Sequence, residues 1–273
     1  MLNSNEKLDK SHAQVEFKAH YHVDAAWGGP TLFSHRHKHL LSGIERADSV
    51  TLDAHKQLYV PMGSGLVVFR NPEKLKSIEH HANYVIRQGS RDLGSNTLEG
   101  SRPGMAMLVH SGLKIIAREG YQILIDQGID KAKAFAEMIS KHQDFELISE
   151  PELNIVTYRY CPASVQAVLK DMDEVQQDKV NGVLDRITKH IQKAQREKGL
   201  SFVSRTRLEP KCYRRRSCVV FRTVLANPLT TPEILREILE EQDVIARTDE
   251  GLSSALKQLK SLCKVRENSE ERV

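Results

Sequence analysis

Residues 22–29 (HVDAAWGG) and 47–56 (ADSVTLDAHK) contain the pattern from which the fold can be predicted. A short apolar run, at residues 21–23 and again at 49–52, ends in both cases at an aspartate. Such runs are typical of strands in a buried parallel sheet. Because ligands of open α/β sheets bind beyond the carboxyl ends of the strands, we expect the residues after both runs to face one crevice.

Asp24 and Lys56 are the two residues in this predicted crevice whose chemistry is most informative. A lysine amine can hold a carbonyl cofactor as a Schiff base, and a buried acid can keep a pyridine nitrogen protonated. The combination indicates pyridoxal phosphate. A structural ion pair between two strand ends is the alternative, which two residues alone leave open.

The two segments together resemble the cofactor-binding core of the group II pyridoxal-phosphate decarboxylases, which act on glutamate, aspartate, aromatic amino acids and diaminobutyrate. The resemblance extends to residues 43–56 (GIERADSVTLDAHK), 97–106 (TLEGSRPGMA) and 151–160 (PELNIVTYRY). It covers most of residues 21–245 and is strongest to the bacterial aspartate and glutamate decarboxylases.

The resemblance implies an α/β fold of the pyridoxal-phosphate-dependent transferase class (aspartate aminotransferase-like, fold type I). In this interpretation residues 1–20 are a poorly structured or truncated start. Residues 21–143 form the C-terminal part of the cofactor-binding large domain with its connecting helices, and residues 144–273 form a small α+β domain. In the family a long region before HVDAAWGG supplies the cofactor-phosphate loop and a stacking ring. We therefore expect either the C-terminal portion of a longer polypeptide or a truncated relative.

Roles for individual residues follow from the resemblance. Lys56 is expected to bind pyridoxal phosphate as a Schiff base, and Asp24 is expected to pair with its pyridinium nitrogen. Ala26 matches a small residue that packs flat against the ring, and His55 matches a histidine that contacts the cofactor phosphate or the departing lysine. Asp53 stands where many family members carry asparagine, which places a negative charge near the phosphate.

Arg102 lies just before a predicted helix whose first turn Pro103 suits. A guanidinium can hold a carboxylate by two parallel hydrogen bonds, and the resemblance implies that Arg102 holds the α-carboxylate of the substrate. A surface arginine at the end of a loop is the alternative. Residues 83–100 are predicted to form a functional loop. Tyr84 at its start matches a structural tyrosine, so the proton donor to the carbanion stays unassigned.

Three alternating histidines, His35, His37 and His39, raise the question of a metal site. On a strand they would share one face, and neutral imidazole binds zinc or copper. The intervening Arg36 and Lys38 and the lack of an acid nearby in the sequence favour a solvated connection instead. We expect no metal.

Hydrophobic periodicity and capping signals predict the remaining elements. The predicted strands are a buried strand at residues 63–69, a half-buried strand at 154–160, and antiparallel neighbours at 201–208 and 217–225. The predicted helices are 72–78, 105–142 with interruptions near Gly120 and Gly128, one that ends at Gly199, and one capped by Thr231. Three arginines at 214–216 are predicted to form a solvated turn, with phosphate contact as the alternative.

Composition is that of an ordinary soluble protein, with 40% hydrophobic and 28% charged residues and a net charge of +4. Such a mild charge gives no reason to expect nucleic acid or an anionic membrane as a partner. Neither a membrane span nor the apolar core of a signal peptide is present in the sequence, so a cytoplasmic location is expected. The four cysteines lack metal or disulfide spacing and are expected to be reduced.

Three functions are compatible with these patterns. The first is a decarboxylase that converts aspartate to β-alanine or glutamate to γ-aminobutyrate, with an amino acid as substrate and, by the resemblance, a homodimeric assembly. The second is another fold type I enzyme, an aminotransferase or a cysteine desulfurase. The third is a truncated, catalytically inactive family member.

Overall fold

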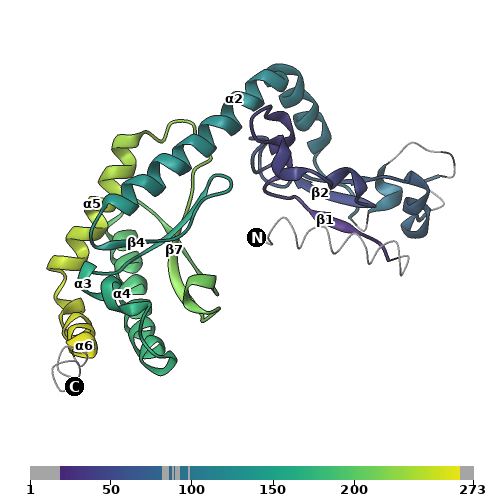
Figure 1. Ribbon diagram of the computed structural model, residues 1–273. Coiled ribbons are helices and arrows are strands. Elements are labelled where there is room, and N and C mark those ends of the chain that lie inside the picture. Colours follow the sequence, from purple (N-terminus) through teal and green to yellow (C-terminus); the bar gives the residue numbers. More distant parts are fainter. Residues whose placement is uncertain (1–18, 82–85, 88, 90–92, 98, 265–273) are drawn as a thin grey trace. The chain divides into compact units, whose positions relative to one another are not determined.

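The computed structural model describes residues 19–81, 86–87, 89, 93–97 and 99–264. The chain divides into two compact units, Met1–Asp126 (unit 1) and Gln127–Val273 (unit 2). Each unit has a sheet of its own (Figure 1). Tyr84, which was matched to a structural tyrosine, lies outside the described residues, as does part of the predicted loop at 83–100.

Unit 1 contains a three-stranded sheet with the order β1-β2-β3. Strands β1 (His22–Asp24) and β2 (Ser49–Asp53) run parallel, and Asp24 lies opposite Thr51. Strand β3 (Gly65–Phe69) pairs antiparallel with β2. The predicted parallel pair is therefore confirmed, and it places the ends of β1 and β2 at the same edge of the sheet.

The prediction that β1 and residues 63–69 are buried strands is wrong for this structure. His22 and Asp24 are exposed, and Val67 and Val68 of β3 are 53% and 54% exposed. The physical reason is that β1 and β3 are the two edge strands of a small sheet. In the described part of this sheet, only the central strand β2 has a neighbour on both sides.

The connection between β1 and β2 consists of 3-10 turns. They are η1 (Gly29–Phe33), η2 (Lys38–Leu41) and η3 (Ile44–Arg46). Gly29 packs closely against β2: a Cβ there would lie 2.5 Å from Cδ2 of Leu52, so a larger residue would require the Leu52 side chain to move. After β3 come two further 3-10 turns, η4 (Pro72–Ile78), which confirms the predicted short helix, and η5 (Leu93–Asn96).

Helix α2 (Met105–Lys141) contains a break at Ala117, where φ is 56° and ψ is −179°. The interruption predicted near Gly120 is therefore present, at Ala117, whereas the one predicted near Gly128 is wrong because the helix keeps its geometry there. Beyond the break, the predicted apolar face is confirmed. Its members are Ile125, Ile129, Ala132, Phe135 and Ile139, and each is at most 2% exposed.

Unit 2 contains an antiparallel sheet with the order β4-β5-β7-β6. Its strands are β4 (Phe145–Ser149), β5 (Ile155–Tyr160), β6 (Ser204–Leu208) and β7 (Cys218–Val224). The predicted pairing of the last two strands is confirmed. Strand β5 is buried on both faces from Val156 to Tyr160, so the prediction of a half-buried strand there is wrong. Its central place between β4 and β7 explains the difference.

Four helices and two 3-10 turns complete unit 2, and α4 and α5 lie alongside the sheet (Figure 1). They are α3 (Ala163–Leu169), α4 (Glu174–Lys198), η6 (Lys211–Tyr213), α5 (Pro232–Thr248), η7 (Glu250–Leu252) and α6 (Ser253–Lys264). The predicted ends are confirmed. Gly199 ends α4 with φ of 73°, and the side chain of Thr231 accepts a hydrogen bond from Ile234 N at the start of α5.

No helix in the described part of the chain is long and apolar enough to cross a lipid bilayer. All four cysteines are free thiols, as expected. Burial raises the pKa of the Cys161 thiol to about 12, so this side chain stays protonated near neutral pH. Cys161 is thus a small apolar core residue.

Arg159 on β5 is the centre of a buried polar cluster in unit 2. Its Nε donates to Glu146 Oε2 at 2.9 Å and its Nη1 donates to Asn181 Oδ1 at 2.9 Å. The ring of Tyr213 lies 4.6 Å from the guanidinium carbon, and the Tyr213 hydroxyl donates to Glu146. Because Arg159 is completely buried, its charge depends on these partners.

The arginine turn at residues 214–216 lies immediately after Tyr213. Arg214 and Arg215 have positive φ values of 50° and 61°. Arg216 forms ion pairs with Glu174 and Asp178, one turn apart on α4. The expected solvated turn is therefore joined to α4 through Arg216 and, at 3.9 Å from Glu174, through the exposed Arg214, while Arg215 is exposed.

We predict that Arg159→Met lowers the free energy of unfolding by about 3–5 kcal/mol, because it leaves the Glu146 carboxylate buried without its cation. Urea denaturation followed by circular dichroism measures the change. The double variant Arg159→Met/Glu146→Leu should recover at least half of the loss.

The matched control is Arg207→Met, which removes an ion pair of 3.5 Å between Arg207 and Asp185. Because the Arg207 side chain is 55% exposed, the free energy of unfolding should fall by less than about 1 kcal/mol. Equal losses in Arg159→Met and the double variant would contradict the buried-charge explanation.

Candidate functional site

Asp24 is the last residue of β1, and its side chain is exposed at the edge where β1 and β2 end. Its Oδ1 accepts a hydrogen bond from the backbone N–H of Ala26 at 3.0 Å. This bond holds the carboxylate over the turn that leaves the strand. The Ala26 side chain is partly exposed beside it.

The segment that follows β1 is joined by two hydrogen bonds to β2 and by one to the segment that follows β2. Ala25 N donates to Thr51 O at 3.0 Å, and Asp53 N donates to Ala26 O at 3.2 Å. The buried side chain of Gln57 donates from Nε2 to the carbonyl of Trp27 at 2.7 Å. The two segments therefore have a fixed relative position.

Lys56 lies one tight turn beyond β2. Its backbone N–H donates to Asp53 O at 3.1 Å, and its Nζ is 2.7 Å from Asp53 Oδ2. The Lys56 side chain is 34% exposed and that of Asp53 is 20% exposed. The amine is thus both accessible and directed by a neighbouring carboxylate.

His55 is fixed by the loop that precedes β3. Its Nδ1 lies 3.0 Å from the carbonyl oxygen of Ser64. A carbonyl can only accept, so Nδ1 carries the proton. The other nitrogen, Nε2, lies 3.8 Å from Asp53 Oδ2. His55 and Lys56 therefore approach the same carboxylate oxygen from two directions.

The structure brings Asp24 and Ala26 to the same edge of the sheet as His55 and Lys56, as the sequence predicted. Asp53 also lies there, and its contact with Lys56 was not predicted. The sequence signal for this contact was the spacing of three residues between an acid and a lysine at the end of a strand. Gln57 was missed as well, because nothing in a sequence shows which carbonyl a glutamine will reach.

Arg102 is not joined to these residues in the part of the chain that the structure describes. Its Nη1 donates to Glu99 Oε2 at 2.7 Å and to Thr97 Oγ1 at 3.1 Å. Its side chain is 45% exposed. The predicted role in holding a substrate carboxylate stays a prediction.

The three histidines do not share a face. His35 and His39 are exposed, whereas His37 is buried and its Nε2 lies 4.0 Å from Asp126 Oδ1. That acid is distant in sequence, so the sequence could not reveal it. Within the described residues no group of three or more metal-binding side chains is present.

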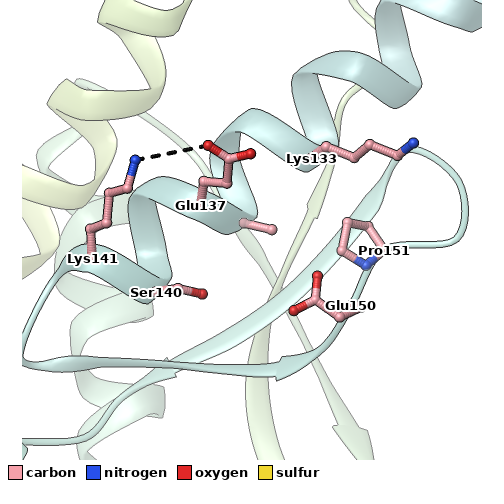
Figure 2. Close-up of a pocket in the computed structure, with 7 residues that line it drawn as sticks. Lys133, Glu137, Ser140, Lys141, Glu150 and Pro151 are labelled. Carbon is pink, nitrogen blue, oxygen red and sulfur yellow. Dashed lines mark ion pairs between the residues drawn. The ribbon is translucent and has the colours of Figure 1, made fainter.

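A surface hollow of about 460 Å³ lies in unit 2 between α2 and the turn that joins β4 and β5 (Figure 2). Its lining residues are Lys133, Ala136, Glu137, Ser140, Lys141, Glu150 and Pro151. Figure 2 shows the only ion pair among them, Lys141 with Glu137 at 3.9 Å. The hollow contains none of the predicted site residues, so chemistry and not cavity size identifies the candidate site.

Comparison with solved structures identifies the fold. Mouse CSAD in its apo form matches with a TM-score of 0.72 and 26% identity, over 86% of this chain and 47% of that chain. The rice (Oryza sativa) TDC structure with PLP and tryptamine matches with a TM-score of 0.65 and 18% identity, over 85% of this chain and 43% of that chain. The expected fold type I architecture is confirmed.

Comparison with known sequences identifies the family. Residues 6–161 match the pyridoxal-dependent decarboxylase conserved domain. Aspartate 1-decarboxylase of Aliivibrio fischeri is 58% identical over 231 residues, which are 85% of this chain and 42% of that protein. Aromatic-L-amino-acid decarboxylase of Bacillus atrophaeus is 29% identical over 82% of this chain and 44% of that protein.

The chain thus spans less than half the length of these relatives. The expected cofactor, pyridoxal phosphate, is the one that defines the family. With the conserved domain matched over residues 6–161 and 58% identity to one of its enzymes, this chain belongs to the pyridoxal-dependent decarboxylase family of carboxy-lyases.

Proposed function

We propose that this chain carries the cofactor-binding lysine and the pyridinium-pairing acid of a decarboxylase that acts on a small acidic L-amino acid. The observation that supports this most strongly is the parallel pairing of β1 and β2. That pairing places Asp24 and Lys56 at one edge of the sheet, in segments joined by hydrogen bonds.

The side chains at this edge fit pyridoxal phosphate. The Asp24 carboxylate is exposed and oriented by Ala26 N, so one oxygen can receive a proton-bearing ring nitrogen. The Lys56 amine is accessible enough to react with an aldehyde. Ala26 presents a methyl group small enough for a flat ring to approach. An acid, an amine and a small apolar surface are the groups that this cofactor needs.

Each residue then has a defined task. Lys56 would hold the cofactor through its aldehyde group. Asp24 holds the proton on the ring nitrogen, and His55 contacts the cofactor phosphate or the departing lysine. The bound cofactor supplies the electron sink for the carbanion left when CO₂ departs.

Arg102 is proposed to hold the α-carboxylate of the substrate, so that the bond to CO₂ lies perpendicular to the cofactor ring. Its present pair with Glu99 involves side chains that are 45% and 75% exposed. Exposed pairs contribute little free energy, so a substrate carboxylate can replace Glu99 at small cost.

Aspartate is the substrate that we propose first, with glutamate as the alternative. Support comes from the 58% identity to an aspartate 1-decarboxylase. We also propose a homodimer, a cytoplasmic location, and a division into a large-domain part at residues 21–143 and a small domain at 144–273. The presence of one sheet in each unit supports two domains, although the compact units meet at Asp126 and Gln127, within α2, and not at residue 143.

Borohydride reduction of the purified chain with added pyridoxal phosphate tests the lysine. We expect a phosphopyridoxyl adduct confined to Lys56 by peptide mass mapping, and its loss in Lys56→Ala. Lys76→Ala is the control, because Lys76 is 68% exposed and lies outside the site. Adducts spread over surface lysines, with none enriched at Lys56, would contradict the proposal.

Product analysis tests the reaction. With the cofactor-loaded chain we expect aspartate to release CO₂ and form β-alanine, faster than glutamate forms γ-aminobutyrate. Asp24→Asn should lower the rate about 100-fold, because a neutral amide stabilises the protonated ring far less. A keto acid or sulfide in place of CO₂ would instead indicate an aminotransferase or a desulfurase. Cofactor bound at Lys56 without any product would show an inactive family member.

A further inference from the structure

The ion pair between Asp53 and Lys56 is the shortest contact that either side chain makes among the described residues. Asp53 Oδ2 lies 2.7 Å from Lys56 Nζ. Both side chains are more than half buried, at 20% and 34% exposure. Water therefore competes for this pair less than for an ordinary surface pair.

The backbone of Asp53 is held on every side. Its N–H donates to the carbonyl of Ala26, its own carbonyl accepts from Lys56 N, and it pairs with Gly65 of β3. The carboxylate therefore starts from a fixed point. Lys56, by contrast, has four rotatable bonds and needs a partner to define where its amine lies.

The two carboxylate oxygens of Asp53 have different surroundings. Oδ2 faces both Lys56 Nζ and, at 3.8 Å, His55 Nε2. Oδ1 lies on the side of Gly65, where a Cβ would be 3.5 Å away, an ordinary van der Waals distance. Asp53 thus faces two residues of the proposed site through one oxygen.

A second pair with the same spacing provides an internal comparison. Glu73 and Lys76 are also three residues apart and form an ion pair. Their side chains are 65% and 68% exposed on a 3-10 turn. The spacing alone is therefore unremarkable, and what distinguishes Asp53 is its burial and its fixed backbone at the end of β2.

We propose that Asp53 is a positioning residue that holds the Lys56 amine at the edge of the sheet shared with Asp24, ready to meet the cofactor aldehyde. This inference rests on the proposed function of Lys56. Capture joins Nζ to the aldehyde carbon, and the carbonyl oxygen leaves as water with two of the three ammonium protons. Nζ must therefore leave Asp53 Oδ2 as the bond forms.

Two readouts on the full chain test this role in Asp53→Asn. The first is trace acetylation of the cofactor-free chain with acetic anhydride, measured at Lys56 by mass mapping. Loss of the ion pair should raise Lys56 acetylation about threefold, whereas Glu73→Gln should change Lys76 acetylation less. The second is the rate at which pyridoxal phosphate forms an adduct with Lys56, measured by trapping with borohydride at successive times. This rate should fall about threefold or more, because the freed amine is no longer directed.

Opposite changes in the two rates are the signature of positioning. Equal increases in acetylation and in adduct formation would overturn the proposal, because Asp53 would then only mask the amine. Unchanged rates would also overturn it. Asp53→Glu keeps the charge but moves the carboxylate by one methylene. We therefore expect adduct formation at Lys56 to be as slow as in Asp53→Asn, while Lys56 acetylation stays as low as in the unmodified chain. This variant decides the question if Asp53→Asn does not fold, as judged by circular dichroism.

The two proposals fail in distinguishable ways. If the unmodified chain forms no adduct at Lys56, the proposed function fails. The acetylation arm would still report whether Asp53 restrains the amine, since it needs no cofactor. If the adduct forms at the same rate in Asp53→Asn, the proposed function stands and the positioning role is wrong.

Discussion

The parallel pairing of β1 with β2 is the constraint on which the candidate site depends. Parallel strands end at the same edge, so a register that sets Asp24 opposite Thr51 also brings the turn after Asp53 next to the turn after Asp24. A change of register by one residue would turn the side chain of Asp24 to the other face. Every role proposed for Lys56 and Asp24 follows from this pairing.

Backbone hydrogen bonds and one buried side chain convert that pairing into a defined site. Asp53 is central because its N–H, its carbonyl and its carboxylate each reach a different part of the edge. Rigid backbone places a functional side chain more accurately than a mobile loop does. The Lys56 amine can therefore be both accessible and directed.

Unit 2 is stabilised by a different kind of interaction. Its strand β5 carries Arg159, a fully buried cation whose Nε and Nη1 donate to Glu146 and Asn181 and whose guanidinium carbon lies over the ring of Tyr213. Such a cluster is costly to break and sets the position of the turn that follows Tyr213. The strained Arg214 and Arg215 are held between Tyr213 in the core and Arg216, which is paired to α4.

The sequence alone determined the parallel strand pair, the family, and helix ends such as Gly199 and Thr231, because these follow from sequence motifs and short-range caps. It was wrong about the burial of β1, β3 and β5 and about an interruption of α2 near Gly128. Burial depends on how many strands flank a strand, which a local pattern does not contain. Only the tertiary structure decided that Asp53 forms an ion pair with Lys56 and that Gln57 donates to the Trp27 carbonyl, because these contacts require the folded turns that bring the atoms within hydrogen-bonding distance.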